Sequence, residues 1–291
     1  MDLSVILVNW NTREELSACL GSLRQALAEG FAAETEVIVV DNASADRSAE
    51  TVRSDFPEVR LFANSEHLNY AAGSNQALRA ARGQSLLLLN PDTQVTANTL
   101  AGLLHFLQER PRAAAVAPRL VSPDGTVQQS VRGFPEPIAL LGELTALARL
   151  FPTSRLGAYR CRRLAHDRPS QVDQPMTSAL LVRRSALDAV GLFDEGFPLF
   201  FNDVDLCFRM KEMGWEIWYE PGLTVVHDGG ASTRQIRPEA IRQSHRGLER
   251  FYEKHYRHRL PPPVFLLIRG LIRMAGALRE RLAEGRQHAR I

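Results

Sequence analysis

A run of four leucines that ends in polar residues constrains this chain more than any other feature. The run covers residues 86–89 and is followed by Asn90, Pro91 and Asp92. An apolar run of this length, between a glycine and a proline, is typical of a central strand covered on both faces, as in parallel sheets. Pro91 cannot donate a ladder hydrogen bond, so the strand should end there. Ligands of open α/β sheets bind beyond the carboxyl ends of strands, where Asn90 and Asp92 are placed. An alternative is that Asp92 caps a helix starting near Thr96.

Length and composition indicate one catalytic domain with appendages. The chain has 291 residues, of which 45% are hydrophobic, which suffices for one sizeable core. The formal net charge of +2 gives no reason to expect nucleic acid as a partner.

The cysteines and the first residues favour a cytoplasmic protein. The three cysteines, Cys19, Cys161 and Cys207, are far apart and form no C-x-x-C motif, so neither a disulfide framework nor a structural zinc site is expected. The chain begins with a strand-like run rather than a basic signal-peptide region, and no run of eighteen apolar residues occurs.

Strand-like and helix-like segments alternate in the first 120 residues. Strands are predicted at residues 3–9, 35–40, 59–62, 86–89 and 114–117, and helices at residues 14–28, 71–81 and 97–108. This alternation predicts an α/β fold with a doubly wound, mostly parallel sheet flanked by helices. Neither G-x-G-x-x-G after the first strand nor G-x-x-x-x-G-K-[ST] is present, which argues against NAD enzymes and P-loop NTPases.

Two segments of this half suit a nucleotide. Asp41, in V-V-D-N-A-S, can accept the imide N–H of uracil or thymine, a donor that cytosine lacks; the alternative is an Asx turn. Residues 69–75, N-Y-A-A-G-S-N, are predicted to be a loop that passes into a helix, with Gly73 allowing a ligand close to the backbone and Asn75 contacting base or ribose. Tight packing of a helix on the sheet explains the small residues equally well.

The pattern changes after residue 121. A turn at S-P-D-G precedes a short strand, and residues 134–174 read as an insertion rich in proline and arginine. Its arginines suit either a solvated basic surface or phosphate binding. A strand is expected at residues 176–182.

A second chemical centre is F-F-N-D-V-D-L, residues 200–206. Leu206, Met210 and Met213 repeat at helical spacing, so a helix should begin at or just before Asp203. Residues two apart point to different sides of a helix, so Asp203 and Asp205 should have different tasks. Asp205 can pair with Arg209, whereas burial beside two phenylalanines can raise the pKa of Asp203 towards that of a general base. An N-cap is the alternative for Asp203.

A third centre is V-V-H-D-G-G-A-S, where a strand leads His227 into a glycine loop. A neutral imidazole there can join Asp92 around a divalent cation. A core or surface role is the alternative for a lone histidine.

Taken together, these motifs resemble the inverting GT-A glycosyltransferases of the family-two type, especially the bacterial rhamnosyltransferase-like branch. The resemblance covers about residues 3–232, with V-D-N-A-S, N-Y-A-A-G-S-N, L-L-L-L-N-P-D, F-F-N-D-V-D-L and V-V-H-D-G-G-A-S in the family's order. The chain departs from the family at Asn90, which replaces the first aspartate of D-x-D, at Asn202, which replaces an acidic residue, and at Ser178, where glycine is frequent.

The resemblance implies a GT-A fold and a set of site residues. It implies that Asp203 is the catalytic base and that Asp92 and His227 hold Mg²⁺ or Mn²⁺. Acceptor or supporting roles fall to Asn90, Ser178, Asn202 and Asp205, and the nucleotide-binding residues are Asn9, Asn11, Asp41, Asn69, Gly73 and Asn75.

The implied reaction is a single displacement that transfers a sugar, with rhamnose favoured, from a dTDP or UDP donor to a saccharide or lipid-linked saccharide in cell-surface polysaccharide synthesis. No second carboxylate motif suggests the nucleophile that a retaining double displacement would need. Two alternatives stay open: a UDP-hexose donor, and a catalytically silent protein that binds a nucleotide sugar, which Asn90 and Asn202 favour.

The domain organisation follows from these motifs. We predict a catalytic domain over residues 1–235, with a nucleotide-binding half at 1–120 and an acceptor half at 121–235, and a helical extension over residues 236–291. In the extension, residues 264–278 form an apolar helical stripe with arginines near its other side. Such a helix suits either the surface of an anionic membrane at the cytoplasmic face or a contact in a homo-oligomer.

Overall fold

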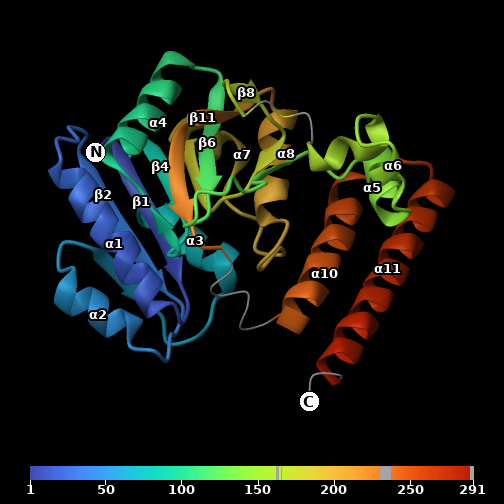
Figure 1. Ribbon diagram of the computed structural model, residues 1–291, viewed down its shortest axis with the longest axis horizontal. Helices are drawn as coiled ribbons and strands as arrows, with labels where there is room; N and C mark the ends of the chain where they lie inside the picture. Colours follow the sequence, from blue (N-terminus) through green and yellow to red (C-terminus); the bar gives the residue numbers. More distant parts are fainter. Residues whose placement is uncertain (162–163, 165, 230–236, 289–291) are drawn as a thin grey trace.

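The computed structural model describes residues 1–161, 164, 166–229 and 237–288 (Figure 1). A large mixed sheet, flanked by helices, forms the left and centre of Figure 1, and a group of helices stands on the right. The sheet order is β3-β2-β1-β4-β10-β6-β11-β5, with β8 paired to β11. The predicted α/β fold is therefore confirmed.

The first half of the sheet is parallel and built from alternating strands and helices. β1 pairs in parallel with β2 on one side and with β4 on the other, and β3 continues the parallel order beyond β2. The elements of this half are β1 (Leu3–Asn9), α1 (Arg13–Ala28), β2 (Thr35–Asp41), α2 (Ser48–Asp55), β3 (Arg60–Ala63), α3 (Asn69–Ala80) and β4 (Ser85–Leu89).

The leucine run forms β4 in the middle of the sheet. Its four leucines are at most 2% exposed, which stabilises the fold by about 1.5–3 kcal/mol for each side chain. Leu86 and Leu88 join the core on one face, whereas Leu87 and Leu89 join the core on the other face. This is the two-sided burial that an uninterrupted apolar run predicts.

The second half of the sheet is mixed. β10 lies antiparallel between β4 and β6, so the sheet is fully parallel only up to β4. β11 pairs in parallel with β6 and antiparallel with β5 and β8. The elements are β5 (Thr93–Gln94), α4 (Ala97–Glu109), β6 (Ala113–Val121), β8 (Ser170–Gln171), β10 (Ala179–Arg183), α7 (Arg184–Val190), α8 (Asn202–Glu212) and β11 (Glu216–His227).

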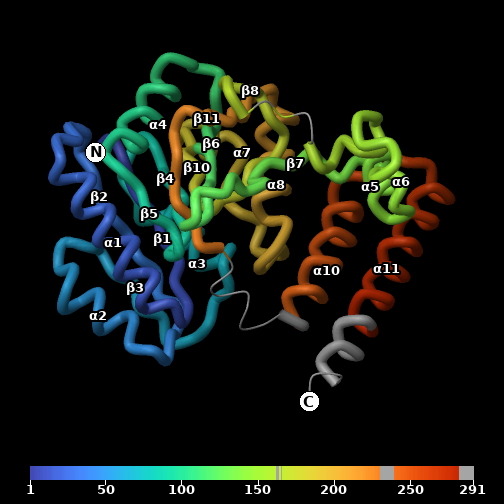
Figure 2. The backbone as a smooth tube through the Cα atoms, viewed as in Figure 1, coloured from blue at the N-terminus to red at the C-terminus, as the bar shows by residue number. Residues whose placement is uncertain are grey.

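The helical extension packs on the catalytic domain instead of standing apart from it. Phe251 and Tyr252 of α10, and Tyr256 just after it, belong to the same buried cluster as Phe208 of α8. Gly276 of α11 lies against His245 of α10, where a Cβ would come within 3.2 Å of the imidazole. The extension consists of α10 (Arg237–His255) and α11 (Pro262–His288), and Figure 2 shows the two helices side by side.

The predicted insertion forms a small helical layer against this extension. It contains α5 (Pro137–Leu144), α6 (Leu147–Leu150) and the 3₁₀ helix η1 (Arg155–Arg160), and a small second sheet pairs β7 (Val131–Arg132) with β9 (Gln174–Pro175). α5 contacts both η1 and α11. None of the helices among the described residues is long and apolar enough to cross a bilayer.

Candidate active site

The predicted site residues gather where several strands end. β1, β2 and β4 run in parallel and end at Asn9, Asp41 and Leu89, so the polar residues that follow them lie at one edge of the sheet. β10 runs the opposite way, and its first residue, Ala179, pairs with Leu89. Ser178 therefore reaches the same edge from another segment of the chain.

Strand pairing also brings His227 to Asp92. His227, the last residue of β11, pairs with Thr93 of β5, and the amide of Asp228 donates to the carbonyl of Asp92. As a result, Nε2 of His227 lies 3.4 Å from Oδ1 of Asp92, with both side chains less than 10% exposed. Asp92 does not cap the next helix, because Thr96 is the N-cap of α4 and its hydroxyl accepts from the amide of Thr99.

Gln128 determines which imidazole nitrogen of His227 carries the proton. Its amide NH₂ donates to the carbonyl oxygen of His227 at 2.7 Å, which orients the amide because a carbonyl oxygen can only accept. Oε1 of Gln128 then faces Nδ1 of His227 at 2.8 Å and must accept from it. In the neutral imidazole the proton is therefore on Nδ1, and Nε2 presents a lone pair to the Asp92 carboxylate.

This arrangement fits a divalent cation. Nε2 of His227 is buried and makes no hydrogen bond within the described part of the chain, and an electron-pair donor facing a carboxylate is stabilised by a positive ion between them. Ligands about 2.1 Å from a metal in octahedral geometry lie about 3 Å apart, close to the observed separation of these atoms. The described residues contain no group of three His, Cys, Asp or Glu side chains that could hold a metal, so other ligands would come from a diphosphate and water.

Hydrogen bonds connect the residues next to Asp92 to the rest of this edge, through Asn90, Ser178 and Tyr70. The side-chain amide of Asn90 donates to the hydroxyl of Ser178 at 3.2 Å, and its backbone amide donates to the Ser178 carbonyl. The neighbouring Thr177 lies within hydrogen-bond distance of the Tyr70 hydroxyl. Asn90 thus holds the segment that leads into β10.

Asp203 occupies the first turn of α8, which begins at Asn202 as the helical spacing predicted. Burial, opposed by the amide of Val204 and the side chain of Gln174, raises the pKa of Asp203 to about 6. Gln174 donates to Oδ2 of Asp203 at 3.2 Å and fixes the direction of that oxygen. The residue remains partly accessible, so the carboxylate can be reached by an acceptor.

Asn202 and Asp205, the neighbours of Asp203, have structural tasks. The buried amide of Asn202 donates to the carbonyls of Phe197 and Leu199, and its Oδ1 accepts from the amide of Asp203. Asp205 makes the predicted pair with Arg209 at 2.8 Å. It also accepts from His255 of α10 and pairs with Lys254, each at 2.7 Å.

Asn9, Asn11 and Asp41 form a network between the first two strands. Oδ1 of Asp41 accepts from Asn9 and from the hydroxyl of Ser44, and Oδ2 accepts from the Ser44 amide. Asn11 has a positive φ of 51° and accepts from the amide of Ala45. Asp41 closes the Asx turn that was the alternative interpretation, but each carboxylate oxygen has two acceptor positions, and Oδ2 retains one.

Residues 69–75 were expected to be a loop that passes into a helix over residues 71–81, and the helix instead begins two residues earlier, at Asn69. These residues are the first two turns of α3, with Asn69 at a φ of 64°. A Cβ at Gly73 would lie 3.1 Å from side-chain atoms of both Asn42 and Val8, so glycine allows the close packing of α3 on the sheet. Asn75 is 1% exposed and its amide bonds to the backbone of Phe193 in both directions, which ties α3 to that segment. Packing thus accounts for Gly73 and Asn75, and we leave both out of the nucleotide site.

Sequence reasoning did not identify Gln128 or Gln174. Gln128 lies in an irregular segment and Gln174 in the two-residue strand β9, and their partners are 99 and 29 residues away. No local periodicity or spacing signals such contacts. The last residues of the V-V-H-D-G-G-A-S motif, 230–232, lie outside the described residues.

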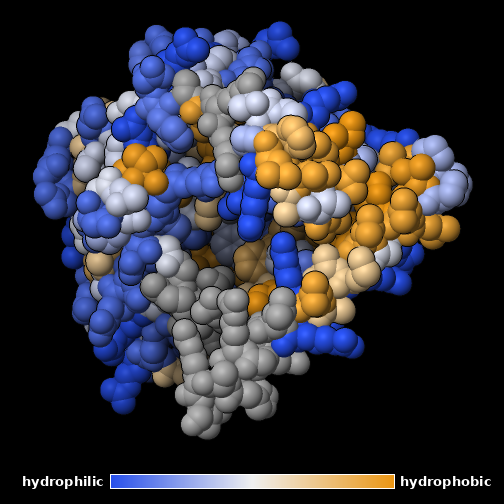
Figure 3. Space-filling model, turned by 45° about the vertical axis from the view of Figure 1, so that its right-hand side comes forward, coloured by the Kyte–Doolittle hydropathy of each residue, from blue (hydrophilic) through white to orange (hydrophobic). Residues whose placement is uncertain are grey.

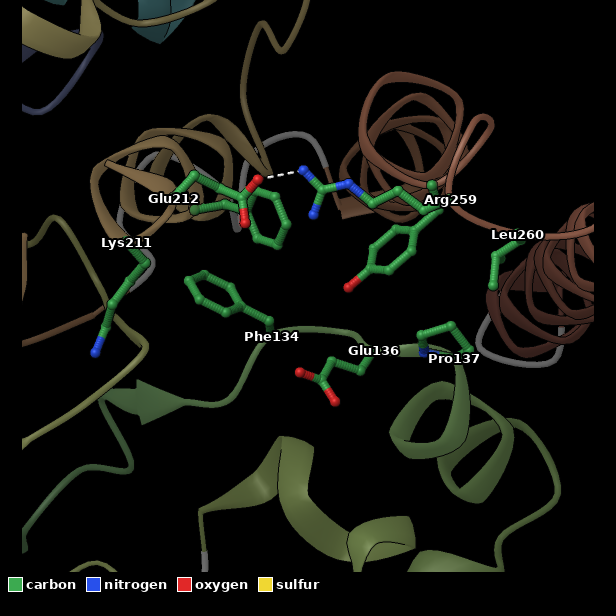
Figure 4. Close-up of a pocket in the computed structure, with 9 residues that line it drawn as sticks. Phe134, Glu136, Pro137, Lys211, Glu212, Arg259 and Leu260 are labelled. Carbon is green, nitrogen blue, oxygen red and sulfur yellow. Dashed lines mark hydrogen bonds and ion pairs between the residues drawn. The ribbon is translucent and has the colours of Figure 1, made fainter. Parts of the chain in front are cut away.

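A cavity of about 460 Å³ lies away from this edge. It is lined by Phe134, Glu136, Pro137, Phe208, Lys211, Glu212, Tyr256, Arg259 and Leu260, and Figure 4 shows Glu212 and Arg259 joined by an ion pair across it. None of the predicted site residues lines the cavity. It separates the end of α8 from the turn between α10 and α11.

Comparison with known proteins identifies the family of the chain. Residues 4–190 match the model of the glycosyl transferase family 2 domain. An N-acetylglucosaminyl-diphospho-decaprenol L-rhamnosyltransferase of Mycobacterium tuberculosis is 32% identical over 245 residues, which are 79% of this chain and 77% of that protein.

Two solved structures share the fold. The mannosyltransferase PcManGT from Pyrobaculum calidifontis, in complex with GDP-Man and Mn²⁺, superposes with a TM-score of 0.58 at 20% identity, covering 97% of this chain and 73% of that one. GalNAc-T7 with UDP, GalNAc and Mn²⁺ gives 0.57 at 15% identity, covering 78% and 44%. These likenesses show the GT-A fold. With the family match and the rhamnosyltransferase relative, they establish that the chain is a glycosyltransferase and belongs to glycosyl transferase family 2.

Proposed function

We propose that this glycosyltransferase transfers rhamnose, with inversion, from a pyrimidine nucleoside diphosphate to a hydroxyl of a lipid-linked saccharide during cell-surface polysaccharide synthesis. The observation that carries the proposal is the state of Asp203. It is a carboxylate with a pKa raised to about 6, oriented by Gln174, and partly accessible. A general base works best when its pKa is close to the working pH.

Asp203 removes the proton of the acceptor hydroxyl while the oxygen attacks the anomeric carbon. The bond from that carbon to the nucleoside diphosphate breaks in the same step, and the configuration inverts. One base is sufficient for this single displacement, whereas retention would require a nucleophile on the other face of the sugar.

Asp92 and His227 hold the divalent cation in this proposal. A bound Mg²⁺ or Mn²⁺ would supply positive charge to the departing diphosphate. Both solved structures named above contain Mn²⁺, which supports the assignment. Asn90 takes a positioning role, because its amide is engaged with Ser178.

Asp41 receives the base of the nucleotide. Asp41 is 2% exposed. The acceptor position that remains on its Oδ2 suits the imide N–H of thymine or uracil, whereas cytosine has no donor there. Asn9 and Asn11 support this end of the site through their bonds to Asp41, Ser44 and Ala45. In this proposal residues 1–120 bind the donor, and residues 121–235 provide Gln174 and Asp203 towards the acceptor and His227 towards the cation.

The identity of the sugar and the acceptor rests on the relative. The mycobacterial relative is named for transfer of L-rhamnose to N-acetylglucosaminyl-diphospho-decaprenol. We propose that this chain also uses a lipid-linked saccharide as its acceptor, at the cytoplasmic face of the membrane. A UDP-hexose donor is the alternative, since uracil and thymine present the same imide to Asp41.

A donor panel tests the proposal. Release of nucleoside diphosphate should be highest with dTDP-rhamnose, should require an acceptor, and should stop in chelator and return with Mn²⁺ or Mg²⁺. Asp203→Asn should lower kcat by about 10²- to 10⁴-fold while donor affinity stays the same. The control is Asp188→Asn, an exposed carboxylate on α7.

Three results would overturn parts of this proposal. Full turnover by Asp203→Asn would exclude Asp203 as the base, and full activity in chelator would exclude a role for the metal. A product whose anomeric configuration is retained, as seen by NMR, would exclude the single displacement. Donor binding by calorimetry without transfer to any acceptor would instead support a silent nucleotide-sugar-binding protein.

A further inference from the structure

The helices on the right of Figure 1 expose many large apolar side chains. In α5, α6 and the residue after α6, the exposed ones include Leu150 at 73% and Phe151 at 53%. The others of this group are Ile138, Leu141 and Leu147. Buried partners such as Leu140 and Ala148 show that these short helices already have an inner face, so the exposed side chains form a second, outer face.

α11 also has two apolar faces. Phe265, Ile268 and Ile272 pack inward against the core, whereas Leu266, Leu267 and Met274 are 62–65% exposed. The single stripe predicted over residues 264–278 is therefore divided, with Leu267 and Leu278 on the outer face. Because α11 contacts α5, the outer faces adjoin, and Figure 3 shows apolar side chains gathered on this side of the molecule.

The same two segments each carry a net positive charge. Residues 137–168 contain six arginines and two carboxylates, and residues 262–291 also contain six arginines and two carboxylates. They therefore carry a formal charge of +8, which leaves −6 for the rest of the chain, since the total is +2. Exposed Arg149 and Arg155, beside Leu150 and Phe151, make no ion pair with any described residue.

We propose that the outer faces of α5, α6 and α11, here called the apolar face, lie on the surface of an anionic lipid bilayer. Amphipathic segments with basic residues bind such surfaces through buried apolar side chains and through attraction to anionic headgroups. A contact between two copies would bring these basic segments together, and their like charges would repel. An anionic bilayer instead neutralises the charges of both segments. The proposal deepens the proposed function, because a lipid-linked acceptor is presented at such a surface.

Vesicle flotation tests the proposal with the full chain and without nucleotide or acceptor, so the result does not depend on transfer activity. The wild-type protein should float with phosphatidylcholine vesicles that contain about one third phosphatidylglycerol, and much less with phosphatidylcholine alone. Leu150→Ser with Phe151→Ser, and separately Leu266→Ser with Leu267→Ser, should each reduce the bound fraction more than tenfold. Arg149→Gln with Arg155→Gln should reduce the preference for anionic vesicles.

Met213→Ser is the matched control, because Met213 is 58% exposed but follows α8, outside the apolar face. It should leave flotation unchanged, and all variants should retain the wild-type circular dichroism spectrum. The proposal is overturned if the wild-type protein does not float with anionic vesicles. It is also overturned if the serine variants leave flotation unchanged and only convert an oligomer to a monomer in sedimentation, since the face would then contact a second copy.

Discussion

Asp203 and Asp205 are two residues apart, and their pKa values are shifted in opposite directions. Burial raises the pKa of Asp203 to about 6. Burial also opposes the charge of Asp205, but hydrogen bonds from His255 and Lys254, with the charge of Arg209, lower its pKa to about 2. The first carboxylate is thus available to exchange a proton near neutral pH, whereas the second remains a permanent anion.

The raised pKa of Asp203 predicts how transfer depends on pH. A general base is active when deprotonated, so the rate should be constant above about pH 7 and fall towards tenfold per unit below about pH 6. Initial rates of nucleoside diphosphate release between pH 5 and 9 measure this profile. A rate that stays constant down to pH 5 would contradict the assignment of Asp203.

The same residue should weaken the folded state at neutral pH. Its pKa is above that of the unfolded chain, so its contribution to stability is fully present below pH 3.8 and is lost as the pH rises through about 6. Asp203→Asn should therefore raise the free energy of unfolding at pH 7.5 by about 1–3 kcal/mol, with little gain at pH 4. Urea denaturation at both pH values measures the difference, and a variant that is less stable at pH 7.5 would indicate a structural carboxylate.

Gln128 should control metal affinity through His227. Gln128→Met keeps the side-chain volume but removes the acceptor of the Nδ1 proton, so the tautomer with a lone pair on Nε2 is no longer favoured. Partners of this kind typically change metal affinity about 10- to 100-fold. Titration of Mn²⁺ by EPR, with a nucleoside diphosphate present, measures the loss. The exposed neighbour Gln129→Met is the control, and equal Mn²⁺ affinity in both variants would exclude this role.

At the scale of elements, the contact between α8 and α10 depends on one buried anion. Asp205 is 0% exposed and joins Arg209 of its own helix to Lys254 and His255 of α10. α10 in turn places Phe251 against Phe208 and Phe201. The first turn of α8, which carries Asp203, is therefore supported from the extension.

Asp205→Asn should destabilise the protein by about 2–3 kcal/mol at pH 7, because Arg209, Lys254 and His255 lose the buried carboxylate that they share. Since its pKa is depressed to about 2, this stabilisation is present above pH 3.8 and is lost as the pH falls through 2. Chemical denaturation measures the change. Glu50→Gln, in an exposed pair with Arg47, should change the stability by less than about 0.5 kcal/mol. A similarly small change in stability for Asp205→Asn would show that the contact between α8 and α10 does not depend on the charge of Asp205.

At the scale of the whole molecule, the extension and the catalytic domain share one core. Leu248, Phe251, Tyr252 and Phe265 of the extension belong to the same cluster as Leu206 and Phe208. The segments before and after the predicted boundary at residue 235 therefore contribute to one continuous hydrophobic core.

A chain that ends at residue 235 should therefore not fold into a soluble monomer, whereas a chain that ends at residue 260 should retain α10 and more structure. Removal of α10 exposes Phe208 and Phe197 and leaves Asp205 without two of its partners. Size-exclusion chromatography and circular dichroism of the two truncations provide the comparison. A monomeric, cooperatively folding 1–235 fragment would show that the extension is an independent domain.

Much of the fold was predictable because strands and helices are encoded by local patterns. The leucine run predicted a central strand, its end predicted the position of Asp92, and the spacing of Leu206, Met210 and Met213 predicted the start of α8. The helix predicted from residue 71 begins at Asn69, so the expected loop before it is absent from residues 69–70. Small residues serve close packing and ligand contact equally well, and only the tight space around Gly73, beside Asn42 and Val8, favours packing.

The sequence by itself determined which residue types stand at the ends of which strands: Asp41, Asp92 and His227 follow apolar runs whose periodicity is local. Only the tertiary structure decided which side chains meet. The antiparallel insertion of β10, the bond of Gln128 to His227 and the contact of Asp205 with His255 join residues far apart in the chain. Such contacts depend on how whole elements pack around a shared core, and a single sequence carries no local signal for that packing.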